Sequence, residues 1–101
     1  MKLSIIIPFY NSSLTIQDSI ESLQSPILKF IDEIIIYNDG STDNYKEIIK
    51  DIKKRDSRIK FYSSSINRGG AFARNYAIKK SKKKLLMIID ADNIIDPKSL
   101  L

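Results

Sequence analysis

Four short apolar runs, each followed by a polar or glycine-containing segment, constrain the fold of this chain more than any other feature. The runs occupy residues 3–7 (LSIII), 33–37 (EIIIY), 59–62 (IKFY) and 85–89 (LLMII). Three of them are continuously apolar rather than alternating, which is typical of strands buried on both faces. Strands of this kind belong to parallel sheets that helices cover on both sides.

Helical segments separate the runs. Apolar residues recur at helical spacing in segments 14–23, 44–54 and 70–80, and potential capping residues lie at 12–13 and 41–43. Strands and helices therefore alternate along the chain, which indicates right-handed crossovers. We expect an α/β fold: a Rossmann-like, mostly parallel four-stranded sheet flanked by helices.

Composition narrows the possible chemistry. The 101 residues suffice for one domain, and the chain has no His and no Cys. These absences exclude a Ser-His-Asp triad, a Cys nucleophile and the usual zinc ligands, leaving hard cations held by oxygen. Without Cys there are no disulfides, so a cytoplasmic location is expected, including the inner membrane face for a longer protein.

The net charge of +5 comes largely from the run KKSKKK at residues 79–84. Cations at the end of a helix complement its dipole, so we interpret the run as a solvated helix terminus. Aromatic residues do not interleave with the lysines, and nucleic acid is therefore not an expected partner.

Polar side chains follow all four runs: PFYNSS, NDGSTD, SSSINRGGAFARN and DADN. Because the carboxyl ends of parallel strands lie at one edge of the sheet, residues far apart in the sequence can converge there. Asp39, Arg74, Asp90 and Asp92 are expected to meet in this way.

Each of these segments also has a plainer interpretation. Asp39 stands before a glycine and could serve only a turn. The glycine pair at 69–70 could form a simple loop, or could let phosphate oxygens reach backbone N–H groups. Tyr10 fits either core packing or a surface for stacking a planar base. Arg74, near a helix start where a cation opposes the dipole, favours a functional role.

Asp90 and Asp92 are either a solvated strand end or a cation site. Two like charges so close together repel, and a divalent cation reverses that cost. Mg²⁺ and Mn²⁺ commonly take one or two carboxylates and complete their coordination with water and phosphate oxygens. On the acid pair alone, both interpretations stay open.

The segments SIIIPFYN, NDGSTD, NRGGAFARN and DADN, in this order, resemble the N-terminal, nucleotide-sugar-binding part of the family 2 glycosyltransferases, which have the GT-A fold. The resemblance covers nearly all of residues 1–101 and implies a donor-binding domain. It assigns base contacts to Pro8, Tyr10, Asn11 and Asp39, positions beside the nucleotide to Asn67, Gly69 and Arg74, ribose and metal contacts to Asp90, and the more direct metal contact to Asp92.

The resemblance also implies the reaction. A sugar would pass from a nucleotide-sugar, commonly a UDP-sugar, to a hydroxyl of a glycan, lipid or protein, with inversion and with Mn²⁺ or Mg²⁺. The general base of the family lies well beyond the acid motif, so it is expected after Leu101. Asp96 and Pro97 form a helix-start signal close to the end, which suggests the N-terminal part of a longer protein. Asn93 departs from the family, where an acid is frequent.

Other functions remain to be weighed. A non-catalytic nucleotide-sugar-binding module could assemble with copies of itself through the apolar surface that a missing half would cover. A nucleotidyltransferase would need a glycine-rich basic loop after the first strand, where PFYNSS stands. A phospho-receiver domain would need its acids after the first and third strands.

Overall fold

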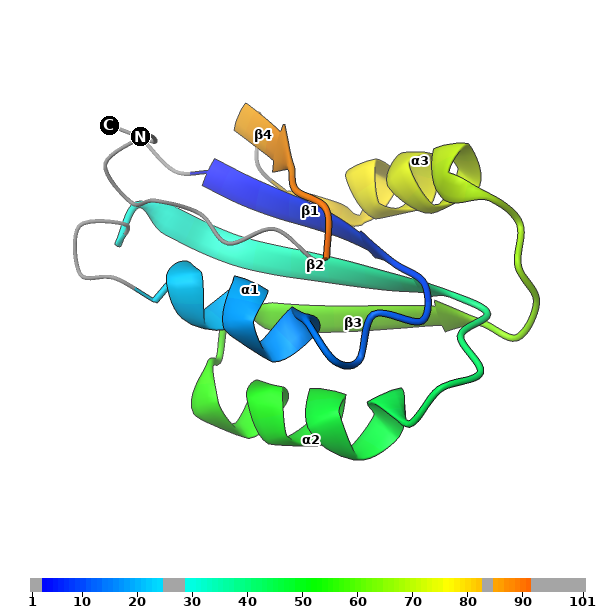
Figure 1. Cartoon of the computed structure of the whole chain (residues 1–101). Coiled ribbons are helices and arrows are strands. Elements are labelled where there is room, and N and C mark those ends of the chain that lie inside the picture. Colours follow the sequence, from blue (N-terminus) through cyan, green and yellow to red (C-terminus); the bar gives the residue numbers. More distant parts are fainter. Residues whose placement is uncertain (1–2, 25–28, 83–84, 92–101) are drawn as a thin grey trace.

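A computed structural model describes residues 3–24, 29–82 and 85–91 of the chain (Figure 1). Strands and helices alternate throughout, as the sequence predicts. In chain order the elements are β1 (Leu3–Phe9), α1 (Ile16–Ser22), β2 (Ile31–Asp39), α2 (Tyr45–Arg55), β3 (Ile59–Ser64), α3 (Gly70–Lys80) and β4 (Leu85–Ile88).

The four strands form one sheet in the order β3-β2-β1-β4, and every neighbouring pair is parallel. β1 is central: Leu3 pairs with Ile31 on one side and with Leu85 on the other. The predicted α/β fold is therefore confirmed, with a sheet that is parallel throughout rather than mostly so.

The two faces of the sheet carry different cores. α1 and α2 cover one face and α3 covers the other (Figure 1). Alternate residues of a strand point to opposite faces; accordingly Ile5 and Ile7 join the larger cluster with α1 and α2, whereas Ile6 joins α3. α3 presents the small residues Ala73 and Ala77, both fully buried, which lets this helix pack close to β1 and β2.

The order of the strands reverses beside β1. The chain passes through α1 and α2 as it moves from β1 outward to β3, and then returns through α3 to β4 on the far side of β1. In open α/β sheets, the crevice at the carboxyl ends of the strands flanking such a reversal is the usual ligand position. The loops after β1 and β4 are therefore the first places to examine.

The predicted helix caps are wrong. α1 begins at Ile16 with Thr15 as its N-cap residue, α2 begins at Tyr45 with Asn44, and neither cap side chain bonds its own helix. Ser12 instead donates to the nearby Tyr10 carbonyl, whereas Ser13 and residues 41–43 take part in contacts between the loops after β1 and β2.

Two polar networks fasten the amino end of the sheet. Buried Glu33 accepts hydrogen bonds from Lys60 Nζ at 2.6 Å, Ser4 Oγ at 2.8 Å and the Lys82 N–H at 2.9 Å. Burial alone would raise the pKa of Glu33, but Lys60 and the other donors outweigh it and lower that pKa to about 2.

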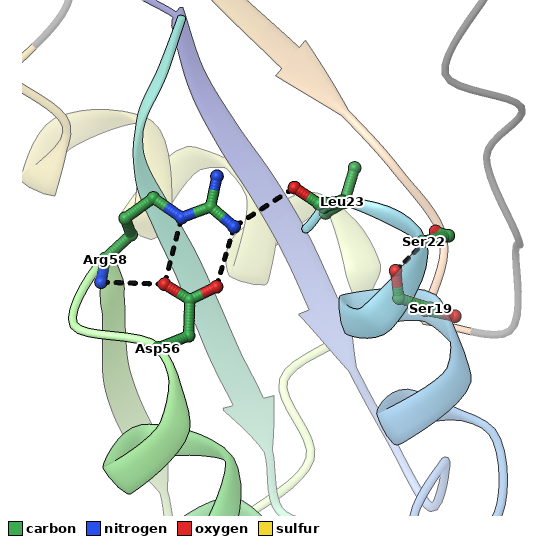
Figure 2. Close-up of polar contacts among 5 residues, drawn as sticks. All are labelled: Ser19, Ser22, Leu23, Asp56 and Arg58. Atoms are coloured by element: carbon green, nitrogen blue, oxygen red, sulfur yellow. Dashed lines mark hydrogen bonds and ion pairs between the residues drawn. The ribbon is translucent and has the colours of Figure 1, made fainter. Parts of the chain in front are cut away.

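The second network joins α1 to the turn after α2. Arg58 donates from Nε and Nη2 to both oxygens of Asp56, and Nη2 also donates to the Leu23 carbonyl at 3.1 Å (Figure 2). The hydrogen bonds from Arg58 lower the pKa of Asp56. Figure 2 also shows Ser22 donating to the Ser19 carbonyl within α1, at 2.6 Å.

The lysine run behaves as the sequence predicts over the residues that the structure describes. Lys79, Lys80 and Lys82 are exposed at the end of α3, and Lys80 Nζ lies 5.5 Å from the centroid of the Tyr62 ring. Within the described ranges, no helix is long and apolar enough to cross a membrane.

Candidate functional site

A pocket of about 190 Å³ lies where the carboxyl ends of β1 and β2 meet the start of α3. Its walls come from three loops or strand ends that are distant in the sequence. The lining residues are Pro8, Phe9, Tyr10, Asp39, Asn67, Gly70 and Ala73. The structure thus brings together four of the residues that the sequence singles out: Pro8, Tyr10, Asp39 and Asn67. Tyr10 is 48% exposed, so it belongs to this surface and not to the core.

Asp39 fixes the loop that precedes α3. Its side chain is buried, and its two oxygens accept hydrogen bonds from the backbone N–H groups of Arg68 at 2.7 Å and Gly69 at 2.9 Å. The Gly69 N–H also contacts Asn67 Oδ1 at 3.0 Å. Each carboxylate oxygen has a second lone pair, so Asp39 can hold this loop and still accept a hydrogen bond from a ligand in the pocket.

Gly40 lets the second and third loops touch. Its φ is +75°, and a Cβ built on it would lie 2.6 Å from the Asn67 nitrogen and the Ile66 carbonyl carbon. Both of those atoms are backbone, so they cannot move aside as a flexible side chain could. Gly69 also has a positive φ, of +97°, but the space around its Cβ position is open. The Asp-Gly pair is therefore both a turn and a contact point.

Asn11 connects the loop after β1 to the loop after β2. It has a left-handed φ of +48°, and its Oδ1 accepts from the Thr42 N–H at 2.8 Å and more weakly from the Asp43 N–H. The Ser13 N–H in turn donates to Asp43 at 3.0 Å. Asn11 is exposed, and it is not among the residues lining the pocket; its contact with a nucleotide stays a prediction.

Arg74 lies on the first turns of α3, beside the glycine pair. Its side chain folds back over the helix start, so that Nη1 would lie 3.2 Å from a Cβ built on Gly70. Arg74 is exposed and forms no ion pair with any residue in the described ranges. Among the residues that the structure describes, the guanidinium therefore has no acidic partner.

Asp90 follows β4 and projects between two anchored neighbours. Ile89 and Ala91 are each 4% exposed, whereas Asp90 is exposed. Asp92, the predicted metal ligand, lies outside the described residues. Within the described part of the chain, no three acidic side chains gather into a metal cage. An accessible carboxylate at this edge has the right donor chemistry for a Mg²⁺ or Mn²⁺ ion that is shared with phosphate oxygens.

The sequence did not reveal the contacts of two hydroxyls, one on the N-cap residue of α1 and one within that helix. Thr15 Oγ1 and Ser19 Oγ donate to the carbonyl of Ala91, at 3.1 and 2.8 Å. No local signal could have shown this pairing, because the partners are separated by most of the chain.

Two larger hollows lie beside α2. One, of about 530 Å³, is lined by aromatic, isoleucine and lysine side chains of α2 and β3; the other, of about 460 Å³, lies between the start of α2 and the serines at the end of β3. Both are on the β3 side of the sheet, away from the strand reversal. The smaller pocket is the better candidate, because it adjoins the reversal and gathers the residues singled out by the sequence.

Comparisons with known proteins agree with this geometry. S. aureus TarS, residues 1–349, has been solved with UDP and with UDP-GlcNAc, and both structures match this chain with a TM-score of 0.82 at 28% identity. They cover 99% of this chain, which spans 30% and 29% of those chains. The match identifies the fold as the N-terminal part of a GT-A structure. A mannosyltransferase from Pyrobaculum calidifontis, solved with GDP-Man and Mn²⁺, shares the fold with a TM-score of 0.75 at 23% identity.

Sequence relatives point the same way. The chain is 44% identical over 95 residues to a poly-beta-1,6-N-acetyl-D-glucosamine synthase of Staphylococcus epidermidis, covering 93% of this chain and 22% of that protein. It is 37% identical to a poly(ribitol-phosphate) beta-glucosyltransferase of Bacillus spizizenii, covering 100% of this chain and 16% of that protein. The chain thus spans about a fifth of the length of these curated relatives. Residues 4–101 match the model of Glycosyl transferase family 2, and the chain belongs to that family.

Proposed function

We propose that residues 1–101 form the donor-binding domain of a glycosyltransferase that uses a UDP-sugar and a divalent cation. The observation that carries the proposal is the pocket at the strand reversal, with buried Asp39 in its wall and Asp90 exposed on the loop after β4. Family membership and the likeness to TarS, which binds UDP and UDP-GlcNAc, support the same ligand class.

Each part of the site has a proposed task. Tyr10 and Pro8 present a flat apolar wall on which a base can stack, and Asp39 accepts a hydrogen bond from its polar edge. Asn67 and Gly69 shape the neighbouring loop. Further roles rest on the remaining loop residues: Asn11 holds the first loop against the second, Arg74 offers a cation to the diphosphate, and Asp90 and Asp92 hold the divalent cation.

The transfer step balances in a simple way. The acceptor oxygen forms a bond to the anomeric carbon while the bond from that carbon to the diphosphate oxygen breaks, so the configuration inverts. When bound, Mn²⁺ or Mg²⁺ would stabilise the negative charge on the departing diphosphate. The acceptor proton goes to a general base, a role we assign to no residue of this chain. Donor binding is therefore the task proposed for these residues.

Titration of UDP into the chain by calorimetry, with Mn²⁺ or with a chelator, tests the proposal. We expect UDP to bind more tightly with Mn²⁺, and we expect Asp92→Ala to remove that enhancement while leaving the metal-free affinity intact. Asp18→Ala, which removes an exposed acid of α1, is the matched control and should bind as the unmodified chain does.

Two results would contradict the proposal. Absence of UDP binding in both conditions overturns the donor-binding role. Wild-type affinity of Asp92→Ala in Mn²⁺ overturns the metal assignment alone.

A self-assembling module is the second candidate function, and the outer strand β4 favours it. Leu85 and Ile88 are 43% and 46% exposed on this strand, which pairs with β1 on its inner side. Among the described strands none pairs with the other edge of β4, and a strand edge with exposed apolar side chains can pair with a second copy. Sedimentation velocity combined with the UDP titration separates the two candidates, because a donor-binding domain binds UDP whether or not it dimerises, whereas a purely self-assembling module dimerises without binding UDP.

A further inference from the structure

We infer that Thr15, the N-cap residue of α1, and Ser19 within α1 are positioning residues for the acid motif at Asp90 and Asp92. The inference rests on the proposed function and extends it to two residues that neither the sequence pattern nor the family resemblance assigns. Both hydroxyls donate to one acceptor, the carbonyl oxygen of Ala91, and Ala91 stands between the two acids.

The hydrogen bond from Ser19 to Ala91 joins two buried residues and is not a chance contact between exposed side chains. Ser19 is 1% exposed and Ala91 is 4% exposed, so their hydrogen bond of 2.8 Å lies in the protein interior. A buried carbonyl needs a donor, and its two lone pairs can take two. Thr15 and Ser19 satisfy both, which leaves the Ala91 peptide little freedom to turn.

Hydroxyls on helices commonly bond to a carbonyl of their own helix. Ser22 of α1 does so, donating to the Ser19 carbonyl at 2.6 Å (Figure 2). Ser19 instead reaches across to Ala91, in a different loop. Thr15 has one proton and two acceptors within reach, and the shorter contact is again to Ala91, at 3.1 Å against 3.3 Å to the Ser12 carbonyl. The distant partner is thus preferred at both positions.

Core packing and a backbone hydrogen bond to β1 also fix residues 89–91. The Ile89 N–H donates to the Ile6 carbonyl at 2.9 Å, and the side chains of Ile89 and Ala91 both lie in the core cluster shared with α1 and α2. Asp90, between them, is exposed. The backbone is thus fixed on either side of Asp90, and Ala91 is also the residue from which Asp92 follows.

A fixed backbone at this point matters for a charged ligand. Two carboxylates must be presented to one cation at a set separation, and groups that orient metal ligands from behind commonly change metal affinity by about 10- to 100-fold when they are lost. The backbone N–H groups of Thr15 and Ile16 also donate to the Ser12 carbonyl, in the loop after β1. α1 therefore ties the loop that carries Tyr10 to the loop that carries the acids.

The test is a UDP titration of single variants, with Mn²⁺ and with a chelator. Ser19→Ala and Thr15→Val should each weaken binding in Mn²⁺ by about tenfold and change binding in chelator by less than about twofold. Thr15→Ser keeps the hydroxyl and should restore the affinity. Ser22→Ala removes a hydroxyl of the same helix that bonds within it, and should bind as the unmodified chain does.

A double-variant comparison separates positioning from general support. In an Asp92→Ala background, Ser19→Ala should have no further effect on binding in Mn²⁺. A loss of equal size in both metal conditions, or in both backgrounds, overturns the inference, as does an affinity unchanged by Ser19→Ala and Thr15→Val when Mn²⁺ still enhances binding to the unmodified chain. If the unmodified chain does not bind UDP in either condition, the proposed function fails and this inference fails with it.

Discussion

The two ends of the sheet use carboxylates in opposite ways. At the amino end, Glu33 and Asp56 are paired with Lys60 and Arg58 at 2.6 and 2.7 Å, and both have lowered pKa values. At the carboxyl end, Asp39 accepts only backbone N–H groups among the described residues. The difference shows that burial of an acid does not by itself indicate a ligand-binding site. What matters is whether a basic side chain of the protein already neutralises the acid.

Two more acids fit this contrast. Asp43 Oδ1 is buried and has no hydrogen-bond partner among the described residues, and Asp90 is exposed. Within the described ranges, neither forms an ion pair. The carboxyl end thus keeps negative charge available for a cation or for ligand donors, while the amino end has used its charge to hold the strands together.

The largest expected effect comes from breaking the amino-end network. Glu33→Ala should lower the free energy of unfolding by about 3 to 4 kcal/mol, because Lys60, Ser4 and the Lys82 N–H lose a buried acceptor. Urea unfolding followed by circular dichroism measures the change. Glu47→Ala, at an exposed position on α2, is the control, expected within about 0.5 kcal/mol. A loss for Glu33→Ala no larger than that of the control would show that this end is not a fastening point.

Low pH should destabilise the amino end of the sheet. The pKa of Glu33 is lowered from 4.5 to about 2, so its stabilising contribution is complete above pH 4.5 and is lost as the pH falls toward 2. Asp56, also lowered, acts in the same direction.

Urea unfolding at a series of pH values between 6 and 2 measures this effect. In Glu33→Gln the decline over that window should be shallower, since no carboxylate is left to protonate. If the variant and the unmodified chain lose stability equally as the pH falls, protonation of Glu33 does not cause the loss.

A smaller effect is expected at the carboxyl end, where two glycines form a matched pair. Gly40→Ala should destabilise the chain by about 2 kcal/mol, because its Cβ would press on backbone atoms of Ile66 and Asn67 at a positive φ. Gly69→Ala should destabilise the chain by only about 1 kcal/mol, because its Cβ would contact no atom of the described residues and the cost comes only from the positive φ. Thermal unfolding ranks the two. Equal losses would mean that the contact between these loops is not close, and that the carboxyl end is looser than described.

Much of the fold follows from the sequence, for physical reasons that particular residues show. Runs such as IIIY are apolar on both faces, as covered parallel strands are, and apolar residues at helical spacing lie between the runs, so all seven elements were predictable in order. The limits of α3 were predicted as found, since Gly70 and the lysines at 79–80 mark its ends. The strand ends were less visible: β2 continues through the polar residues Asn38 and Asp39, which lie in the sheet and are buried.

The loop connections could not be predicted. Ser13 and Asp43 both resemble helix caps, yet the Asp43 carboxylate accepts from the Ser13 N–H instead. Such pairs form only after β1 and β2 align, and nothing within either loop specifies the partner. The bonds from Thr15 and Ser19 to Ala91 depend in the same way on β4 docking beside β1. The sequence thus indicates which residues gather at the edge but not how they are held.

The placement of β4 has a consequence for the order of folding. β1 pairs with β2 across a connection whose only described helix is α1, but it pairs with β4 only after the whole β2–α2–β3–α3 segment has also been made. Contacts between distant parts of a chain close more slowly than local ones. We therefore expect the half of the sheet that carries Asp39 to form first, and the Ala91 carbonyl after β4 to reach Thr15 and Ser19 last. During synthesis on the ribosome, the pocket wall that contains Asp39 would be assembled before the loop that carries Asp90.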